Sequence, residues 1–234
     1  MLRCLIVTVA ALAGLGSSVA GQDGTFPPAF PRDGATLTFS NEWIAAWDVT
    51  WAVNSPTLMH RHGFDYFGVE LTTSRTQLTS PDGRTRTASL ERGQAWFLAK
   101  GTTHTENGLT ADPPRRAIIV ELKQASRPRV ANTTAFPTGP VSENHAPVID
   151  NEQISMWNVT WLPDETQQTR FNAQHAVVLF VQDCELEWTD AGGARRTQSY
   201  EAGQVEFLPA GMTWSVRSLR EPARVAITML KGTK

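Results

Sequence analysis

Apolar and polar residues alternate in short stretches along most of this chain, and turn-forming residues separate the stretches. Residues 66–71 and 176–182 are rich in Val, Leu and Phe, whereas Pro81-Asp82-Gly83 and Gly192-Gly193 are turn signals. No stretch shows the sustained periodicity of an amphipathic helix. Many short strands joined by regular turns predict an all-β sandwich or barrel.

The whole pattern occurs twice. Residues 41–51 read NEWIAAWDVTW and residues 151–161 read NEQISMWNVTW, at an offset of 110 residues. Other matched positions keep this offset, and they are the pairs Gly83/Gly193, Glu91/Glu201, Gly93/Gly203, Phe97/Phe207 and Gly101/Gly211. A constant offset through strands and turns predicts two copies of one structural unit.

The first twenty residues differ from the rest. Arg3 provides a positive charge, residues 5–16 are apolar, and Ser18-Val19-Ala20 is a small-x-small cleavage pattern. These features predict a signal peptide over residues 1–20, and therefore a periplasmic or secreted protein. The apolar run is too short to span a bilayer comfortably, so we expect no membrane association after cleavage.

Composition shifts mark the remaining boundaries. Residues 21–36 predict an N-terminal arm, and residues 124–146, rich in Pro, Thr, Ser and Asn, predict a linker. The two repeated units are then residues 37–123 and 147–234. After cleavage one cysteine remains, Cys184, so the fold must rest on its core rather than on an intramolecular disulfide.

The nearly balanced charge of the chain argues against nucleic acid as a binding partner. The chain has 21 Lys and Arg against 23 Asp and Glu, a formal net charge of −2. A nucleic-acid-binding protein would need clustered basic residues, which this chain lacks. We therefore expect a small-molecule substrate or ligand, and the barrels could also pair as a homodimer through apolar strands.

Three histidines of the first unit carry the clearest chemical signal. His60 and His62 are two residues apart, so on a strand both side chains point to the same face. His104 follows in the stretch GQAWFLAKGTTHTEN. Three imidazoles that converge inside a barrel would form a site for one divalent ion of Fe, Mn, Ni, Cu or Zn.

These residues resemble the two motifs of the cupin superfamily, G-x5-H-x-H-x3-4-E-x6-G and G-x5-P-x-G-x2-H-x3-N. His60 and His62 match the first motif; Gly93, Gly101, His104 and, one residue early, Asn107 match the second. The resemblance implies two tandem cupin barrels, of the double-stranded β-helix or jelly-roll type. It also implies that His60, His62 and His104 are metal ligands.

The first unit departs from this pattern where the glutamate ligand should follow His62. Tyr66 and Phe67 occupy those positions, with Asp65 one residue early and Glu70 later. Strand alternation puts Tyr66 and Glu70 on the side of His62 and turns Asp65 away, unless a bulge intervenes. Two hypotheses follow: three histidines alone hold the metal, which we favour, or Asp65 is a fourth ligand.

Other residues of the first unit are candidates for contact with a substrate. Tyr66 and Glu70 could act as general base or hydrogen-bond donor. Trp96 is a candidate for a pocket wall because Glu206, not an aromatic residue, occupies the matching position in the second unit. Asn107 is a further candidate substrate contact from the second motif.

The second unit lacks the ligands. Arg170, Asn172 and Trp214 stand at the positions of the three histidines. We expect this barrel to be metal-free, with an interior filled by Trp214, Phe180 and Trp188; the alternative is an organic ligand whose carboxylate faces Arg170. The resemblance to cupins thus extends to a degenerate C-terminal barrel.

The resemblance leaves several functions open, because one fold carries many chemistries. A three-histidine site is similar to that of Fe(II)-dependent cupin dioxygenases, which favours Fe(II) and oxidation of a small organic substrate. The alternatives are a metal-dependent isomerase or lyase, and a non-catalytic binding or structural cupin. An enzyme requires an open pocket at the histidines, whereas Phe64, Phe67 and Trp96 would fill a vestigial site.

Overall fold

A computed structural model describes residues 26–123, 127–163 and 165–232. Every regular element in this part of the chain is a β-strand, and all strand pairs within the sheets are antiparallel. The all-β prediction is therefore confirmed. The predicted signal peptide lies outside the described residues, among which no helix is long and apolar enough to cross a membrane.

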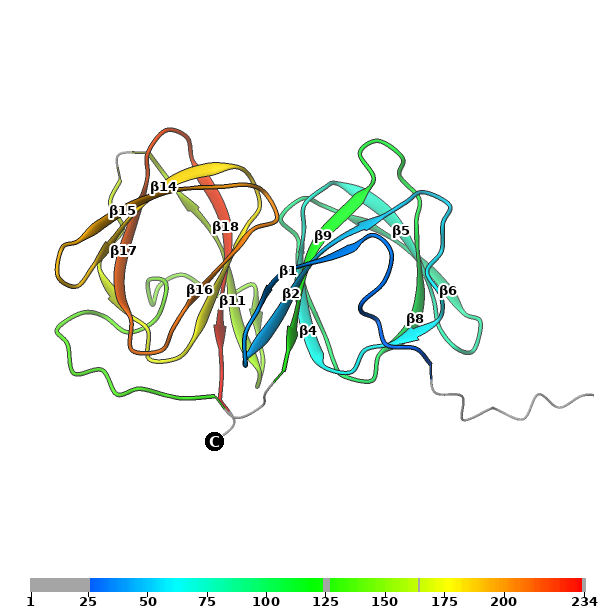
Figure 1. The fold of residues 1–234 in the computed structure, drawn as a ribbon, viewed down its shortest axis with the longest axis horizontal. Helices are drawn as coiled ribbons and strands as arrows, with labels where there is room; N and C mark the ends of the chain where they lie inside the picture. Colours follow the sequence, from blue (N-terminus) through cyan, green and yellow to red (C-terminus); the bar gives the residue numbers. More distant parts are fainter. Residues whose placement is uncertain (1–25, 124–126, 164, 233–234) are drawn as a thin grey trace, which may run out of the picture.

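The first half of the chain forms two sheets that enclose an interior (Figure 1). The five-stranded sheet has the order β1-β2-β9-β4-β7 and the four-stranded sheet has the order β3-β8-β5-β6. The strands are β1 (Ala35–Ser40), β2 (Ile44–Trp51), β3 (His60–Arg61), β4 (Asp65–Glu70), β5 (Ser74–Thr79), β6 (Thr85–Leu90), β7 (Ala95–Leu98), β8 (Thr103–Gly108) and β9 (Arg115–Leu122).

The second half repeats this arrangement with the same strand order. Its sheets are β10-β11-β18-β13-β16 and β12-β17-β14-β15. The strands are β10 (Ile149–Asp150), β11 (Ile154–Trp161), β12 (Arg170–Phe171), β13 (Ala176–Phe180), β14 (Cys184–Asp190), β15 (Arg195–Tyr200), β16 (Val205–Leu208), β17 (Thr213–Ser218) and β18 (Ala223–Leu230). The repeat in the sequence is thus a repeat of the strand topology.

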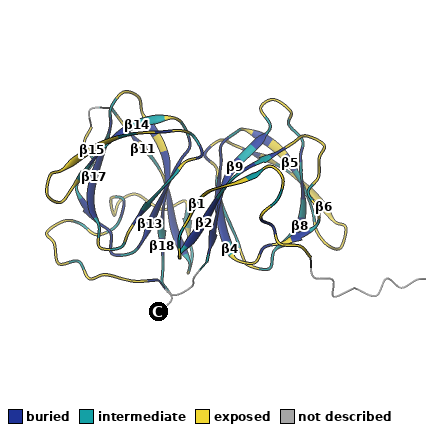
Figure 2. Cartoon of the chain, in the orientation of Figure 1, coloured by how far each residue is buried: buried dark blue, intermediate teal, exposed yellow. Residues whose placement is uncertain are grey.

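The two five-stranded sheets pack against each other, and one apolar core lies between them. Phe67 and Ile118 from the first half belong to the same buried cluster as Met156 and Leu179 from the second. Figure 2 shows the central strands of both halves as buried. Because this core draws side chains from both halves, each half would expose a large apolar surface without the other.

The central strands are buried on both faces, which explains their almost continuous apolar runs. Along β4, Phe67 and Val69 point into the shared core. Tyr66 and Glu70 point to the other face, into the interior of the first half. The period of two along a strand thus decides which residues join the halves and which line the candidate site.

Polar contacts reinforce the junction between the halves. Arg116 pairs with Asp48, and its Nη2 atom donates to the Ala202 carbonyl at 3.0 Å. A Cβ atom on Gly203, whose φ is +101°, would lie 2.8 Å from Arg116 Nη2 and 2.9 Å from Asp48 Oδ2. Glycine is therefore required there both by the backbone conformation and by the close approach of this ion pair.

Candidate metal centre

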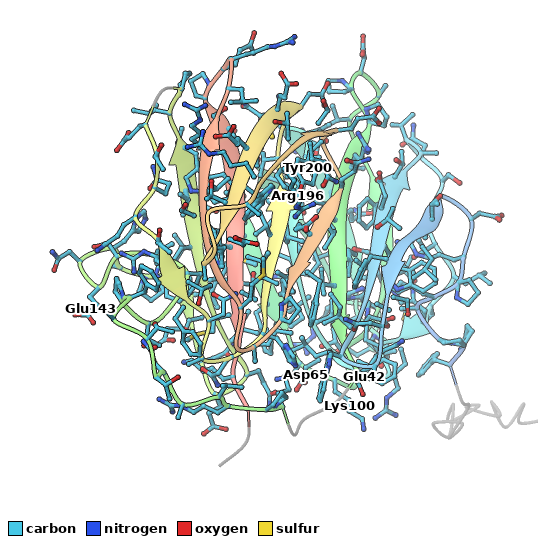
Figure 3. All side chains as sticks on the ribbon, turned by 60° about the vertical axis from the view of Figure 1, so that its left-hand side comes forward. Glu42, Asp65, Lys100, Glu143, Arg196 and Tyr200 are labelled. Carbon is cyan, nitrogen blue, oxygen red and sulfur yellow. The ribbon has the colours of Figure 1, made fainter. Side chains whose placement is uncertain are left out.

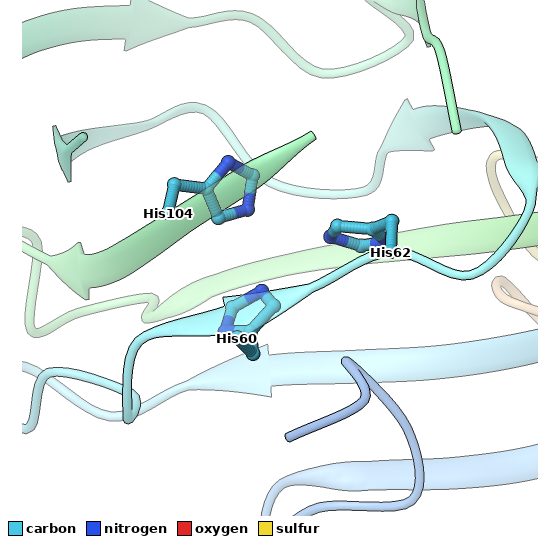
Figure 4. A group of neighbouring side chains, drawn as sticks. All are labelled: His60, His62 and His104. Carbon is cyan, nitrogen blue, oxygen red and sulfur yellow. The ribbon is translucent and has the colours of Figure 1, made fainter. Parts of the chain in front are cut away.

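The three predicted histidines converge in the interior of the first half (Figure 4). His60 lies opposite His104 in the pairing of β3 with β8, and His62 follows two residues after His60. One nitrogen from each ring lies within 4.8 Å of the others. The side chains are buried, with 3%, 2% and 8% of their surface exposed for His60, His62 and His104. Strand pairing thus brings together residues that are far apart in the chain.

The hydrogen-bond partners of the ring nitrogens show whether these histidines could hold a metal ion. His60 Nδ1 bonds to the Leu58 carbonyl at 2.9 Å, so this nitrogen carries the proton and leaves Nε2 free. The Nε2 atoms of His60, His62 and His104 are buried without a hydrogen-bond partner among the described residues. Buried polar atoms normally have partners, and a cation between these nitrogens would satisfy them. The three histidines could therefore bind a metal ion.

The electrostatics of the site keep the histidines in the form that binds metals. Burial, followed by the proximity of the other histidines, lowers the pKa of His62 to about 3. Burial also lowers the pKa of His104 to about 4. Both rings are therefore neutral near pH 7, and a neutral imidazole has the lone pair that a metal requires.

Asp65 does not join the histidines. Its Oδ1 atom accepts a hydrogen bond from the Lys100 backbone N–H at 2.7 Å, and no carboxylate of the described residues belongs to the histidine cluster. Figure 3 shows Asp65 beside Lys100 and Glu42 at one end of the molecule. The structure thus corrects the four-ligand hypothesis: β4 has no bulge that would turn Asp65 inward, and the side chain instead holds a turn.

Tyr66 lies against one of the histidines, on the face that strand alternation predicted. Its ring stacks on His62 with 3.7 Å between centroids and 8° between planes. Its hydroxyl is buried without a hydrogen-bond partner among the described residues. Burial and the charge of Glu106 raise the pKa of Tyr66 well above its usual range, so the hydroxyl keeps its proton. Tyr66 is therefore suited to donate a hydrogen bond rather than to act as a base.

Glu70 also lies on the predicted face, and both oxygens of its carboxylate accept hydrogen bonds from other side chains. Arg115 donates to both oxygens, from Nη2 at 2.8 Å and from Nε at 3.2 Å, and Trp96 Nε1 donates at 2.9 Å. A general base needs a lone pair that reaches the substrate proton. The expectation that Glu70 is a general base does not fit this geometry; the carboxylate instead fixes Arg115 and Trp96.

Two charged residues of the interior, Glu106 and Arg115, were not among the residues predicted from the sequence. Glu106 accepts from Arg115 at 3.1 Å, from Trp51 Nε1 at 2.9 Å and from Arg32 of the N-terminal arm at 3.1 Å. Burial would raise the pKa of Glu106, but the positive charge of Arg115 and other neighbours holds it at about 2. Its position two residues after His104 was a usable signal, since strand alternation places both on one face.

A cavity of about 240 Å³ lies beside the histidines. It is lined by His62, Tyr66, Glu70, Thr76, Leu78, Arg86, Ala88, Leu90, Gln94, Trp96, Leu98, His104, Glu106, Arg115 and Ile119. Trp96 is a wall of this cavity, as predicted for it. Phe67 points into the shared core and Phe64 is 39% exposed, so neither fills the space. Asn107 does not line the cavity, because alternation along β8 turns it away from the face of His104.

A cluster of large apolar side chains occupies the second half. Trp214, Trp188 and Phe180 belong to one buried cluster. Asn172 accepts a hydrogen bond from Trp214 Nε1 at 3.1 Å, which satisfies the indole. Arg170 donates to the Val141 carbonyl at 2.7 Å.

The charged residues of the first interior also have apolar counterparts in the second. At the offset of 110 residues, Phe180 matches Glu70 and Val216 matches Glu106. Ala223 matches Arg115, because each pairs with the last tryptophan of the equivalent strand. The buried pairing of Glu70 and Glu106 with Arg115 therefore has no counterpart at the matched positions of the second half, where Arg170 is buried and charged.

Comparisons with known proteins bear on the fold. No protein-family model and no curated protein matches the sequence. Among solved structures, Bacillus subtilis oxalate decarboxylase, studied for its Mn(II) centres, is similar with a TM-score of 0.56 and 13% identity, over 83% of this chain and 70% of that one. A mutant of the same decarboxylase gives a TM-score of 0.59 and 12% identity, over 86% and 73%.

A second protein of a different source has the same architecture. The cupin 2 conserved barrel domain protein from Leptotrichia buccalis is similar with a TM-score of 0.52 and 11% identity, over 84% of this chain and 88% of that one. Such low identities show the fold and leave the activity open. With its paired antiparallel sheets, repeated topology and structural neighbours, this chain is an all-β protein with the cupin fold.

Proposed function

We propose that this chain is an exported tandem bicupin whose first barrel is a metal-dependent enzyme. The substrate is a small organic molecule, and the favoured reaction is a dioxygenase-type oxidation with Fe(II). The second barrel is metal-free and serves as a structural partner. The export part of the proposal rests on the signal-peptide pattern of residues 1–20.

The observation that carries the proposal is a difference between two otherwise matched interiors: the first combines three converging histidines with buried carboxylates and a buried arginine, and the second lacks this combination at the matched positions. His60, His62 and His104 share their interior with Glu70, Glu106 and Arg115, whereas the second half has apolar or uncharged residues at five of these six positions. Buried ion pairs do not by themselves stabilise a fold better than apolar side chains would. Their retention beside the histidines and an open cavity therefore favours a catalytic role.

In this proposal, different residues of the first barrel bind the metal, contact the substrate and shape the cavity. His60, His62 and His104 would hold the metal, which when bound supplies redox and Lewis-acid chemistry. Tyr66 donates a hydrogen bond to an oxygen of the substrate. Arg115 holds the Glu70 carboxylate in place, and Glu70 in turn orients Trp96 as a wall of the cavity.

Metal content and oxygen uptake test the proposal. We expect about one metal ion per chain by mass spectrometry of the purified protein, and loss of that ion in His62→Ala. His145→Ala is the matched control, because His145 is exposed and lies outside the cluster. Substrate-dependent oxygen uptake by the wild type, but not by His62→Ala, would support oxidation. A protein without metal after reconstitution would contradict the enzyme proposal and favour a binding or structural cupin.

A metal-dependent lyase is the second candidate. It draws on the printed activity of a structural neighbour, which is named an oxalate decarboxylase. Carbon dioxide release without oxygen uptake, in a wild-type protein that contains metal, would select this reaction over the oxidation.

A further inference from the structure

The cavity beside the histidines opens along a seam between the two sheets of the first barrel. Strands β6 and β7 are each at the edge of a sheet, and no ladder joins them. Ala88 and Leu90 from β6 and Trp96 and Leu98 from β7 line the cavity. The two edges therefore frame the mouth through which a ligand would reach His62 and His104.

A single cation stands at this mouth without a charged partner. Arg86 of β6 lines the cavity and is exposed, and it makes no ion pair or side-chain hydrogen bond with the described residues. Deeper in the barrel the charges cancel, since Arg32 and Arg115 pair with Glu106 and Glu70. Among the arginines that line the cavity, Arg115 is paired with carboxylates, whereas Arg86 has no acidic partner among the described residues.

In the second barrel the arginine at the matching position has an acidic partner. The repeat places Arg196 at the position of Arg86 and Glu206 at that of Trp96. Arg196 pairs with Glu206 at 2.5 Å, and Glu206 also accepts from the Tyr200 hydroxyl at 3.1 Å. Figure 3 labels Arg196 and Tyr200 close to each other on the second barrel. An ion pair between β15 and β16 thus balances the charge of Arg196 in the second barrel.

We propose that Arg86 binds a carboxylate of the substrate and that the substrate is a small organic acid with an apolar, ring-sized body. This inference rests on the proposed function and adds the chemical class of its substrate. Guanidinium groups bind carboxylates through paired, charge-assisted hydrogen bonds. Trp96, together with Leu78 and Ile119, gives the cavity an apolar surface for the body of the molecule.

The size of the cavity sets a limit on that body. Its volume of about 240 Å³ is below the roughly 300–1,000 Å³ of common ligand pockets. A single ring or a short branched chain fits this space. The acid group then remains at the mouth, and the reacting end lies toward His62 and His104.

Calorimetric titration with benzoate and its neutral analogue benzamide tests the inference on the full chain as purified. We expect benzoate to bind about tenfold more tightly than benzamide, as a charged hydrogen bond would predict. Arg86→Gln should abolish this preference, and Arg86→Lys should retain part of it because the charge remains. Arg75→Gln is the matched control, since Arg75 is exposed on β5 and does not line the cavity.

The same titration after treatment with a chelator separates this inference from the metal proposal. A carboxylate held by Arg86 keeps its preference in the chelated protein, whatever the metal content. Benzoate binding that survives Arg86→Gln but disappears with the chelator would overturn the assignment, because the metal would then be the anion site. Equal affinities for benzoate and benzamide, or no saturable binding of either, would also overturn it.

Discussion

Arg115 lies between two buried carboxylates, with Glu70 at 2.8 Å on one side and Glu106 at 3.1 Å on the other. The guanidinium carbon also sits 3.9 Å from the ring centroid of Trp51. These contacts satisfy a charge that is almost fully removed from water. They also link two distant parts of the barrel. Glu70 accepts a hydrogen bond from Trp96, and Glu106 accepts one from Arg32 of the N-terminal arm. The wall of the cavity and the arm are therefore parts of one network.

Removing Arg115 should strongly destabilise the protein. Arg115→Met leaves Glu70 and Glu106 buried without a counter-charge, which costs about 3–5 kcal/mol. Chemical denaturation monitored by tryptophan fluorescence measures the loss. Adding Glu70→Gln and Glu106→Gln to the same variant should recover part of the stability, because the uncompensated charges are gone. A change below about 1 kcal/mol in Arg115→Met, the range of exposed ion pairs, would contradict this account of the network.

The Tyr66 hydroxyl should affect catalysis but not metal binding. Tyr66→Phe keeps the ring that stacks on His62 and removes only the hydroxyl. We expect unchanged metal content and a turnover reduced by roughly 10–100-fold, since a donor aimed at a reacting oxygen contributes that order of magnitude or more. Parallel measurements of metal content and steady-state rate check this. Loss of the metal in Tyr66→Phe would assign the residue to the metal site instead.

The metal-free protein should lose stability as the pH falls from about 6.5 toward 3. Burial depresses the pKa of His62 to about 3 and that of His104 to about 4, from an ordinary value of 6.5. In this window the unfolded chain binds protons that the folded chain does not, so the free energy of unfolding decreases as the pH falls. The depressed pKa of Glu106, about 2 instead of 4.5, acts in the same direction below about pH 4.5.

Denaturation curves at a series of pH values, after removal of metal, measure this dependence. The slope should be shallower in His62→Asn, which carries the residue found at the matching position of the second half, Asn172. An equal slope in both proteins would show that His62 does not contribute.

The two barrels should unfold together. Phe67 and Met156 belong to one core although they lie in different halves. Calorimetry of the metal-free protein should therefore give a single cooperative transition. Phe67→Ala should lower its stability by about 3–5 kcal/mol without splitting the transition. Two separate transitions in the wild type would mean that the halves are independent domains.

The sequence alone was sufficient to predict the fold class and the histidines of the candidate site. The offset of 110 residues preserves glycines at turns that only glycine adopts readily, such as Gly93 and Gly203 with φ of +85° and +101°. The H-x-H spacing placed His60 and His62 on one face because side chains alternate along a strand. The same rule put Tyr66 and Glu70 beside His62 and turned Asp65 away.

Tertiary structure decided the rest, because pairing between distant strands has no local signal. The ladder between β3 and β8 places His104 opposite His60. The return of β9 to the side of β4 brings Arg115 to Glu70, and this contact removes the carboxylate that the sequence offered as a base. The composition of a single strand could not reveal that its second face packs against the other half of the chain. Local alternation thus determined which way each side chain points, and only the packing of the sheets determined what it meets there.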